Sequence, residues 1–141
     1  MKTAADILLK QNAPNNYVAP DTLVSDALTL LNALNRIFLV VVDGDDFKGI
    51  FSEHDFVKNV AVRGWDANVC AVGEVMRMDF PMATMDTQIE DVIGLMHSHA
   101  VPYLPVFDGR HFEGVITLHD ITALLIEYRE TVFDLESSAV F

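Results

Sequence analysis

Basic residues and cysteine are scarce in this chain. Its 141 residues include 9 Lys or Arg against 21 Asp or Glu, so the formal net charge is -12. A surface of this charge repels the phosphates of nucleic acids and the headgroups of anionic membranes, so neither is expected as a partner. The one cysteine, Cys70, excludes an internal disulfide and favours a reducing compartment, so we expect a cytoplasmic location.

Long apolar runs are also missing. No segment approaches 18 uninterrupted apolar residues, which argues against a membrane span, and the N-terminal segment turns polar too early for a signal peptide. Hydrophobic residues nevertheless make up 51% of the chain and charged residues 21%. This balance is typical of a folded protein, and the length suits one compact domain or two small ones that share a core.

The chain contains an internal repeat. Residues 21–55 align without a gap with residues 86–120, and 12 of these 35 positions are identical. Shared composition alone does not keep Asp-Gly, Phe-x-Gly and His-Asp in one frame, so the similarity indicates two copies of one structural unit. We expect repeats at residues 3–64 and 71–131, a linker at 65–70, and a tail at 132–141 that either frays or packs on a dimer mate.

Both repeats predict the same secondary structure. Helical spacing of apolar residues predicts helices over 22–34 and 87–98, and Asp21 or Thr22 can cap the first of them. Apolar segments on either side of an Asp-Gly turn predict two hairpins. The expected hairpin strands are 37–42 with 47–51, and 103–107 with 112–116. Helices should follow at 53–62 and 118–128, and short strands should precede at 17–18 and 83–84.

Each unit is therefore β-α-β-β-α with a small helix in front, and the fold class is α+β. A unit of about 60 residues is marginal alone, because one face of its sheet is covered by helices and the other is left apolar. We expect the two repeats to bury these open faces by packing sheet to sheet about a pseudo-twofold axis. Functional residues are then expected in the cleft between the repeats.

A hydroxyl residue and an aspartate follow each hairpin with the same spacing, Ser52-x-x-Asp55 and Thr117-x-x-Asp120. In one interpretation the hydroxyl and the first helical amides bind an anion, while the carboxylate accepts hydrogen bonds from two vicinal hydroxyls, as on a ribose. In the other, each pair is a capping box that satisfies backbone amides at the helix start. Local sequence favours the cap, and the repetition of the whole constellation in register favours the ligand.

This constellation resembles the cystathionine-beta-synthase (CBS) domain family, and the tandem arrangement resembles a Bateman module. The segments that carry the resemblance are Asp21-Thr22, 39–44 and 49–55, with 103–109 and 114–120 in the second repeat. It implies a disk-like module that often dimerises, with two adenosine sites between the repeats. It also implies that Asp55 and Asp120 contact ribose while Ser52 and Thr117 lie near the phosphates.

The resemblance implies further positions. Adenine is expected against the apolar residues that open each middle strand, and backbone of the short first strands can read its edge. These positions are Ile37, Phe38, Pro102 and Tyr103, with Val18 and Ala83 in the short strands. Family members that grip phosphates often place His, Arg or Lys where the middle strand opens, and this chain does not. The nearby positive candidates are Arg36, Lys58, His54 and His119.

Because few positively charged residues lie near the expected site, AMP-like ligands or S-adenosylmethionine are favoured over ATP, and ADP is intermediate in charge. The sequence carries no activated nucleophile, paired carboxylate, metal cluster or phosphate loop, so no enzyme activity, metal site or required cofactor is expected. The expected function is a regulatory module that binds an adenine nucleotide or adenosyl ligand, forms a homodimer and acts on an unknown protein target. The alternative is a ligand-free module for dimerisation or protein interaction.

Overall fold

The structure, a computed structural model, describes residues 2–12 and 14–139. This part of the chain contains two sheets, each of three strands. In the first sheet, β1 (Tyr17–Val18) pairs in parallel with β2 (Phe38–Asp43), which pairs antiparallel with β3 (Asp46–Ser52). The second sheet repeats this order with β4 (Ala83–Thr84), β5 (Tyr103–Asp108) and β6 (His111–Thr117). The predicted α+β class and both hairpins are confirmed.

The helices follow the predicted order with three differences. They are α1 (Ala4–Leu9), α2 (Val24–Leu34), α3 (Glu53–Phe56), the π-helical turn η1 (Val57–Ala61), α4 (Val72–Val75), α5 (Ile89–Ser98) and α6 (Leu118–Ala139). α2 and α5 each begin two residues later than predicted. The helix expected over 53–62 is present, but its second part, η1, is π-helical and joins residues five apart, as in the Val62 N–H to Val57 carbonyl bond of 3.0 Å. α6 continues past residue 128 through most of the expected tail.

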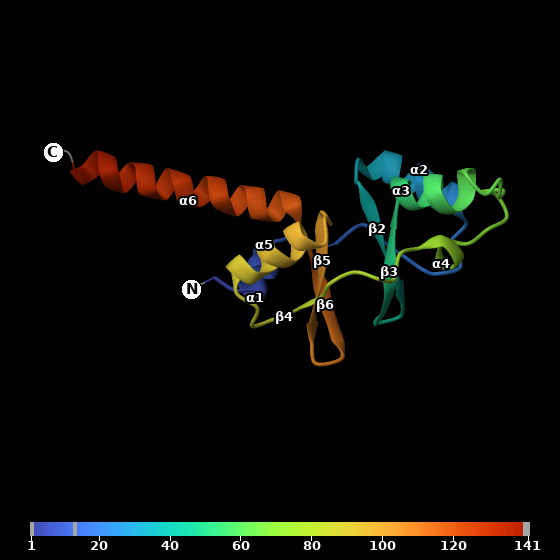
Figure 1. Cartoon of the computed structure of the whole chain (residues 1–141), viewed down its shortest axis with the longest axis horizontal. Coiled ribbons are helices and arrows are strands. Elements are labelled where there is room, and N and C mark those ends of the chain that lie inside the picture. Colours follow the sequence, from blue (N-terminus) through green and yellow to red (C-terminus); the bar gives the residue numbers. More distant parts are fainter. Residues whose placement is uncertain (1, 13, 140–141) are drawn as a thin grey trace. The chain divides into compact units, whose positions relative to one another are not determined.

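Two compact units divide the chain differently from the sequence repeats. The central unit runs from Asn12 to Phe80, and the terminal unit combines the chain up to Gln11 with the chain from Pro81 onward. α1 lies at the start of the first repeat in sequence but belongs to the unit that holds β4, β5 and β6. α4 follows the linker but belongs to the unit that holds β1, β2 and β3 (Figure 1).

In this exchange of helices, α1 and α4 each belong to the unit that holds the sheet of the other sequence repeat. Backbone hydrogen bonds stabilise the exchange. In the central unit the Val24 amide donates to the Cys70 carbonyl at 2.9 Å, and the Ser25 amide donates to the Ala67 carbonyl at 2.9 Å. The predicted cap of α2 by Asp21 or Thr22 is therefore wrong: Leu23 is the N-cap and makes no side-chain cap bond. In the terminal unit the Ile89 amide at the start of α5 donates to the Lys2 carbonyl at 3.1 Å. Distant carbonyls thus satisfy amides that local side chains usually satisfy.

Each unit has its own hydrophobic core on the helical side of its sheet. Successive side chains of a strand point to opposite faces, so Leu39 and Val41 of β2 face the helices while Phe38 and Val40 face away. The buried core of the central unit is Val24, Ala27, Leu31, Leu39, Val41, Phe51, Val60, Cys70, Val72 and Val75. That of the terminal unit is Ala4, Ile7, Ala83, Val92, Met96, Val101, Leu104, Val106, Ile116 and Ile121.

Candidate functional site

In both units the motif hydroxyl lies at the end of the hairpin, opposite the residue that opens the middle strand. Ser52 is the register partner of Phe38, and Thr117 is the register partner of Tyr103. The hydroxyl ends β3 or β6, and a helix begins at the next residue. Each unit therefore gathers a hydroxyl, a helix start and the opening of the middle strand at one end of its sheet.

Asp55 completes a capping box with Ser52. Its Oδ2 accepts hydrogen bonds from the Ser52 amide at 2.8 Å and the Ser52 hydroxyl at 2.9 Å, and the Asp55 amide donates to the Ser52 Oγ at 3.4 Å. The capping interpretation is thus confirmed here. Among the described residues, every hydrogen bond to this carboxylate uses Oδ2, although the side chain is 5% exposed. The Oδ1 oxygen is not consumed by the cap.

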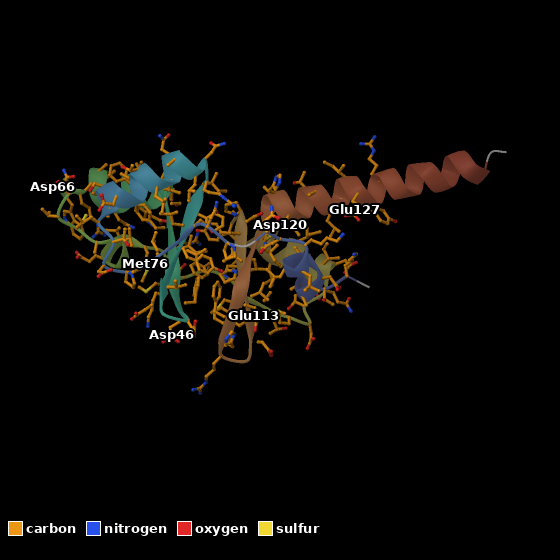
Figure 2. The ribbon with its side chains drawn as sticks, turned by 180° about the vertical axis from the view of Figure 1, so that it is seen from behind. Asp46, Asp66, Met76, Glu113, Asp120 and Glu127 are labelled. Atoms are coloured by element: carbon orange, nitrogen blue, oxygen red, sulfur yellow. The ribbon has the colours of Figure 1, made fainter. Side chains whose placement is uncertain are left out.

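Asp120 makes the same box and gains one more donor. Its Oδ2 accepts from the Thr117 amide at 2.8 Å, and its own amide donates to the Thr117 Oγ1 at 3.1 Å. The Gln11 Nε2 lies 2.7 Å from the same Oδ2 and 2.8 Å from the Val115 carbonyl. Figure 2 shows Asp120 at the start of α6. Gln11 reaches this site because α1 belongs to the terminal unit, which the sequence repeat alone did not indicate.

The apolar positions at the strand openings differ in exposure. Ile37 directly precedes β2 and is 61% exposed, whereas the neighbouring Phe38 is buried. In the terminal unit Pro102 is half-buried and Tyr103 is buried. Ile37 and Pro102 can therefore contact a ligand from outside, while Phe38 and Tyr103 can only form the floor beneath it.

The short first strands form at the predicted residues, and the structure pairs each of them with the middle strand of its unit. Val18 pairs with Val41, and Ala83 pairs with Val106. A residue that sequence reasoning missed, Asn16, is buried just before β1: its carbonyl accepts from the Val40 amide at 2.8 Å. Its side-chain Nδ2 donates to the Phe38 carbonyl at 3.3 Å, so it fixes the opening of the middle strand. A polar residue ahead of a short apolar strand was the available signal.

The positive candidates are exposed. Arg36 directly precedes Ile37, and its Nη2 donates to the Asn15 Oδ1 at 3.1 Å. His54 and His119 each follow the motif hydroxyl by two residues and are exposed, and Lys58 is exposed on η1. Only Arg36 is held by a described hydrogen bond at the strand opening, so the cationic part of the candidate site is small.

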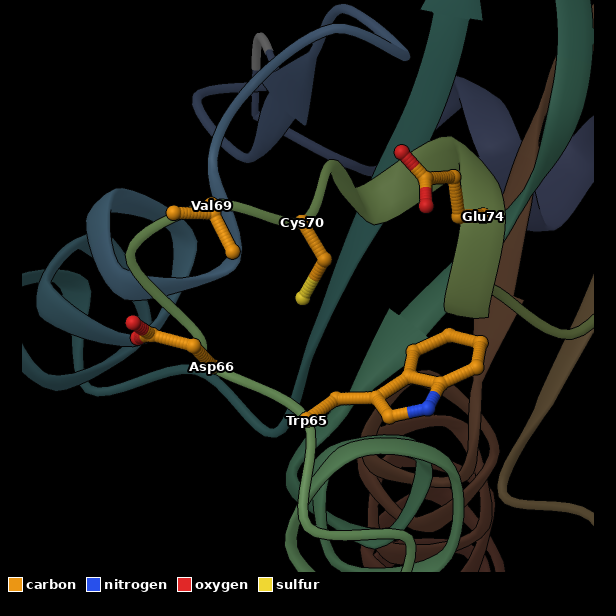
Figure 3. A pocket seen from close by; sticks show the side chains of 5 residues that line it. All are labelled: Trp65, Asp66, Val69, Cys70 and Glu74. Carbon is orange, nitrogen blue, oxygen red and sulfur yellow. The ribbon is translucent and has the colours of Figure 1, made fainter.

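A cavity of about 320 Å³ lies in another part of the central unit. Trp65, Asp66, Val69, Cys70 and Glu74 line it, and none of them is a predicted site residue (Figure 3). Burial raises the pKa of the Cys70 thiol, and the negative charge of Glu74 raises it further. A thiol held in its protonated form is a weak nucleophile, so this cavity offers no activated cysteine.

Metal-binding clusters and membrane-spanning helices are both absent from the described part of the chain. There, no three His, Cys, Asp or Glu side chains gather closely enough to hold a metal ion. None of the described helices combines the length and hydropathy that crossing a bilayer requires.

Comparison with known proteins agrees with this repeated geometry. The family model described as "CBS domain" matches twice, over residues 4–62 and 72–127. The CBS domain-containing protein YhcV of Bacillus subtilis is 26% identical over 121 residues, which cover 86% of this chain and 84% of that protein. A solved structure of a protein with CBS domains from Burkholderia ambifaria has a TM-score of 0.78 and 27% identity, covering 89% of this chain and 95% of that one.

One similar protein is an enzyme, but the similarity is partial. Inosine-5'-monophosphate dehydrogenase of Methanocaldococcus jannaschii is 29% identical over 123 residues, which cover 86% of this chain and 23% of the enzyme. The greater part of that enzyme therefore has no counterpart in this chain.

Proposed function

Because the chain belongs to the CBS-domain family, as a tandem pair of these domains, we propose that it is a regulatory module that binds an adenosine-containing ligand. Tandem CBS domains are a regulatory class of domain, and the adenosine-containing ligand is our proposal. The candidate sites are the strand ends of the two units, at Ser52 with Asp55 and at Thr117 with Asp120.

The observation that carries the proposal is that the capping box uses one carboxylate oxygen of each aspartate, Oδ2, and leaves the other, Oδ1. Oδ2 of Asp55 is held by the capping box, which fixes the orientation of the whole carboxylate. Oδ1 then keeps its lone pairs for the two hydroxyls of a ribose, and hydrogen bonds to an ionised acceptor are the stronger kind. The cap and the ligand site are therefore compatible, and the cap pre-organises the site before a ligand arrives.

The surroundings favour a ligand of low charge. The adenine ring would cover the exposed side chain of Ile37, which removes apolar surface from water. Arg36 is the one guanidinium beside this position, and the chain has a net charge of -12. A triphosphate would meet repulsion with little local compensation, so AMP and S-adenosylmethionine fit better than ATP.

Regulation then requires that the ligand favour one conformation of the protein over another. We propose that this chain passes such a change to a protein target and works as a homodimer in the cytoplasm, without catalysis of its own. The second candidate function is a ligand-free interaction module. The specific observation in its favour is that uncharged residues, Phe38 and Tyr103, open both middle strands, where a phosphate-binding site needs a cation.

Thermal unfolding with added AMP, ADP, ATP or S-adenosylmethionine tests the proposal. A ligand at about 100 times its Kd stabilises the folded state by about 2.7 kcal/mol, which raises Tm by several degrees. We expect this shift for AMP or S-adenosylmethionine in the native protein, and its reduction in Asp55→Ala and Asp120→Ala.

Asp6→Ala is the matched control, because Asp6 forms the same capping box with Thr3 at the start of α1, where Thr3 donates to its Oδ2 at 2.9 Å. It should lower the basal Tm as the other variants do and keep the full ligand-induced shift. If no adenosine compound shifts Tm at millimolar concentration, the ligand-free module is the better description.

A further inference from the structure

The cavity of about 320 Å³ in the central unit has a buried floor and exposed walls. Residues of the linker at 65–70 and Glu74 of α4 line it. The side chain of Cys70 is 6% exposed, and Figure 3 shows its Sγ atom directed into the space between Asp66 and Trp65. Ligand pockets range from about 300 to 1,000 Å³, so this one suits a small group.

The walls of this cavity combine an aromatic ring with negative charge. The indole of Trp65 is 44% exposed, and the side chain of Val69 is 74% exposed. Asp66 and Glu74 are the charged residues among those that line the cavity. A ring face and a carboxylate both attract a cation, and the apolar side chains favour a cation that carries methylene groups.

Two observations show that these attractions already act on groups of the protein itself. Burial raises the pKa of the Cys70 thiol most, and the negative charges of Glu74 and Asp66 raise it further. The guanidinium carbon of Arg63 lies 5.4 Å from the centre of the Trp65 ring, within the range of a cation–π interaction. The floor of the cavity therefore lies in a negative potential, and the ring at its wall accepts a cation.

We infer that this cavity is a binding site for an ammonium or guanidinium group on a short alkyl chain, carried by a free amine or by a basic side chain of a partner protein. Trp65 and the two carboxylates attract the cation, while Val69 and Cys70 contact the alkyl chain. The net charge of -12 adds a long-range attraction. The inference is independent of the proposed adenosine-containing ligand.

Fluorescence of Trp65 tests the inference, because this residue is the only tryptophan in the sequence. Butylammonium chloride is titrated into the full chain from about 0.1 to about 10 mM, a range that brackets the millimolar affinity of a small ligand. Equal additions of NaCl and of neutral butanol serve as references. We expect a saturable change with butylammonium alone. Binding should weaken as NaCl is raised to about 0.15 M, because salt screens exposed charges.

Removal of both carboxylate charges should weaken binding by at least about tenfold, since each exposed ion pair contributes a few-fold. The double variant Asp66→Asn with Glu74→Gln keeps the oxygens that accept from the Asn68 amide at 2.9 Å and the Ala71 amide at 3.5 Å. Asp46→Asn is the matched control, because it makes the same charge change in the same unit. Figure 2 shows Asp46 in the hairpin, well apart from Asp66, so this variant should bind as the native protein does.

Arg63→Gln tests the site in the opposite direction. It should tighten binding by about twofold or more, because it removes a competing cation from the Trp65 ring. A blocked tripeptide with one lysine between two alanines separates the two sources of the cation. Tighter binding of the tripeptide than of butylammonium indicates a side chain of a partner protein, weaker binding indicates a free amine, and both results support the site.

Three results overturn the inference, with circular dichroism confirming that each variant is folded. The first is the lack of a saturable fluorescence change with either probe. The second is an equal response to butanol, because the cavity would then not select a cation. The third is equal binding in the double variant and in Asp46→Asn, because the carboxylates at the cavity would then have no role.

Discussion

The exchange of helices predicts that damage to one sequence repeat appears in the sheet of the other. Ile7 belongs to the first repeat in sequence, yet its buried side chain is part of the core around Leu104 and Ile116 of the terminal unit. Ile7→Ala removes three carbon atoms from this core. Replacements of this kind cost about 2 to 5 kcal/mol, because the cavity that remains adds to the lost transfer free energy. Ile7 is 5% exposed and on a short helix that can shift, so we expect about 2 to 3 kcal/mol.

Urea unfolding measures the total loss of stability, and native-state hydrogen exchange by mass spectrometry locates it. Exchange should accelerate in α5, β5 and β6. The reciprocal control is Val72→Ala, whose side chain is buried in the core of the central unit. It should accelerate exchange in α2, β2 and β3 instead. The reasoning is refuted if Ile7→Ala accelerates exchange mainly between residues 17 and 56, or if the loss stays below about 1 kcal/mol.

Two further predictions concern single residues. Gly49→Ala should destabilise the chain by about 2 kcal/mol or more, because the added Cβ would lie 2.6 Å from the Arg77 carbonyl oxygen. Gly94 lies on a helix, where an added Cβ meets nothing within 4 Å, so Gly94→Ala should stabilise the chain by about 0.5 to 1 kcal/mol. Equal changes in the free energy of urea unfolding for the two variants would contradict this contrast. The Lys10 ammonium lies 2.9 Å from Glu127 Oε2, so hydrogen bonding lowers the pKa of Glu127 from 4.5 and raises the pKa of Lys10 from 10.5. The stabilisation from this ion pair should therefore be complete between about pH 5 and pH 10. It should be lost as pH falls through the lowered pKa of Glu127 or rises through the raised pKa of Lys10. A difference in Tm between native protein and Lys10→Gln that persists at about pH 2 would argue against the pair.

Local sequence predicts the hairpins well, because their determinants lie within a few residues. In both hairpins the register leaves a two-residue loop, and Gly44 and Gly109 have φ values of +62° and +61° there. Glycine adopts this left-handed backbone without steric cost, so the repeated Asp-Gly pair was a reliable signal. The Ser52 and Asp55 capping box is equally local, and its hydrogen bonds follow the expected pattern.

The features that sequence did not predict depend on distant contacts. The start of α2 is set by carbonyls of Ala67 and Cys70, so a cap chosen from neighbouring side chains was wrong. The contact between Gln11 and Asp120 spans more than a hundred residues and exists because α1 belongs to the terminal unit. The repeat predicts a small helix in front of each unit, but it does not indicate which sheet α1 or α4 packs on.

Native mass spectrometry of the purified chain, with AMP and S-adenosylmethionine added one at a time, measures ligand binding most directly. The account predicts a mass increase of one or two ligand molecules per chain, reduced in Asp55→Ala and in Asp120→Ala and unchanged in Asp6→Ala. A spectrum that stays at the mass of the bare chain with both compounds at millimolar concentration, or equal binding in the double variant of Asp55 and Asp120, would contradict it.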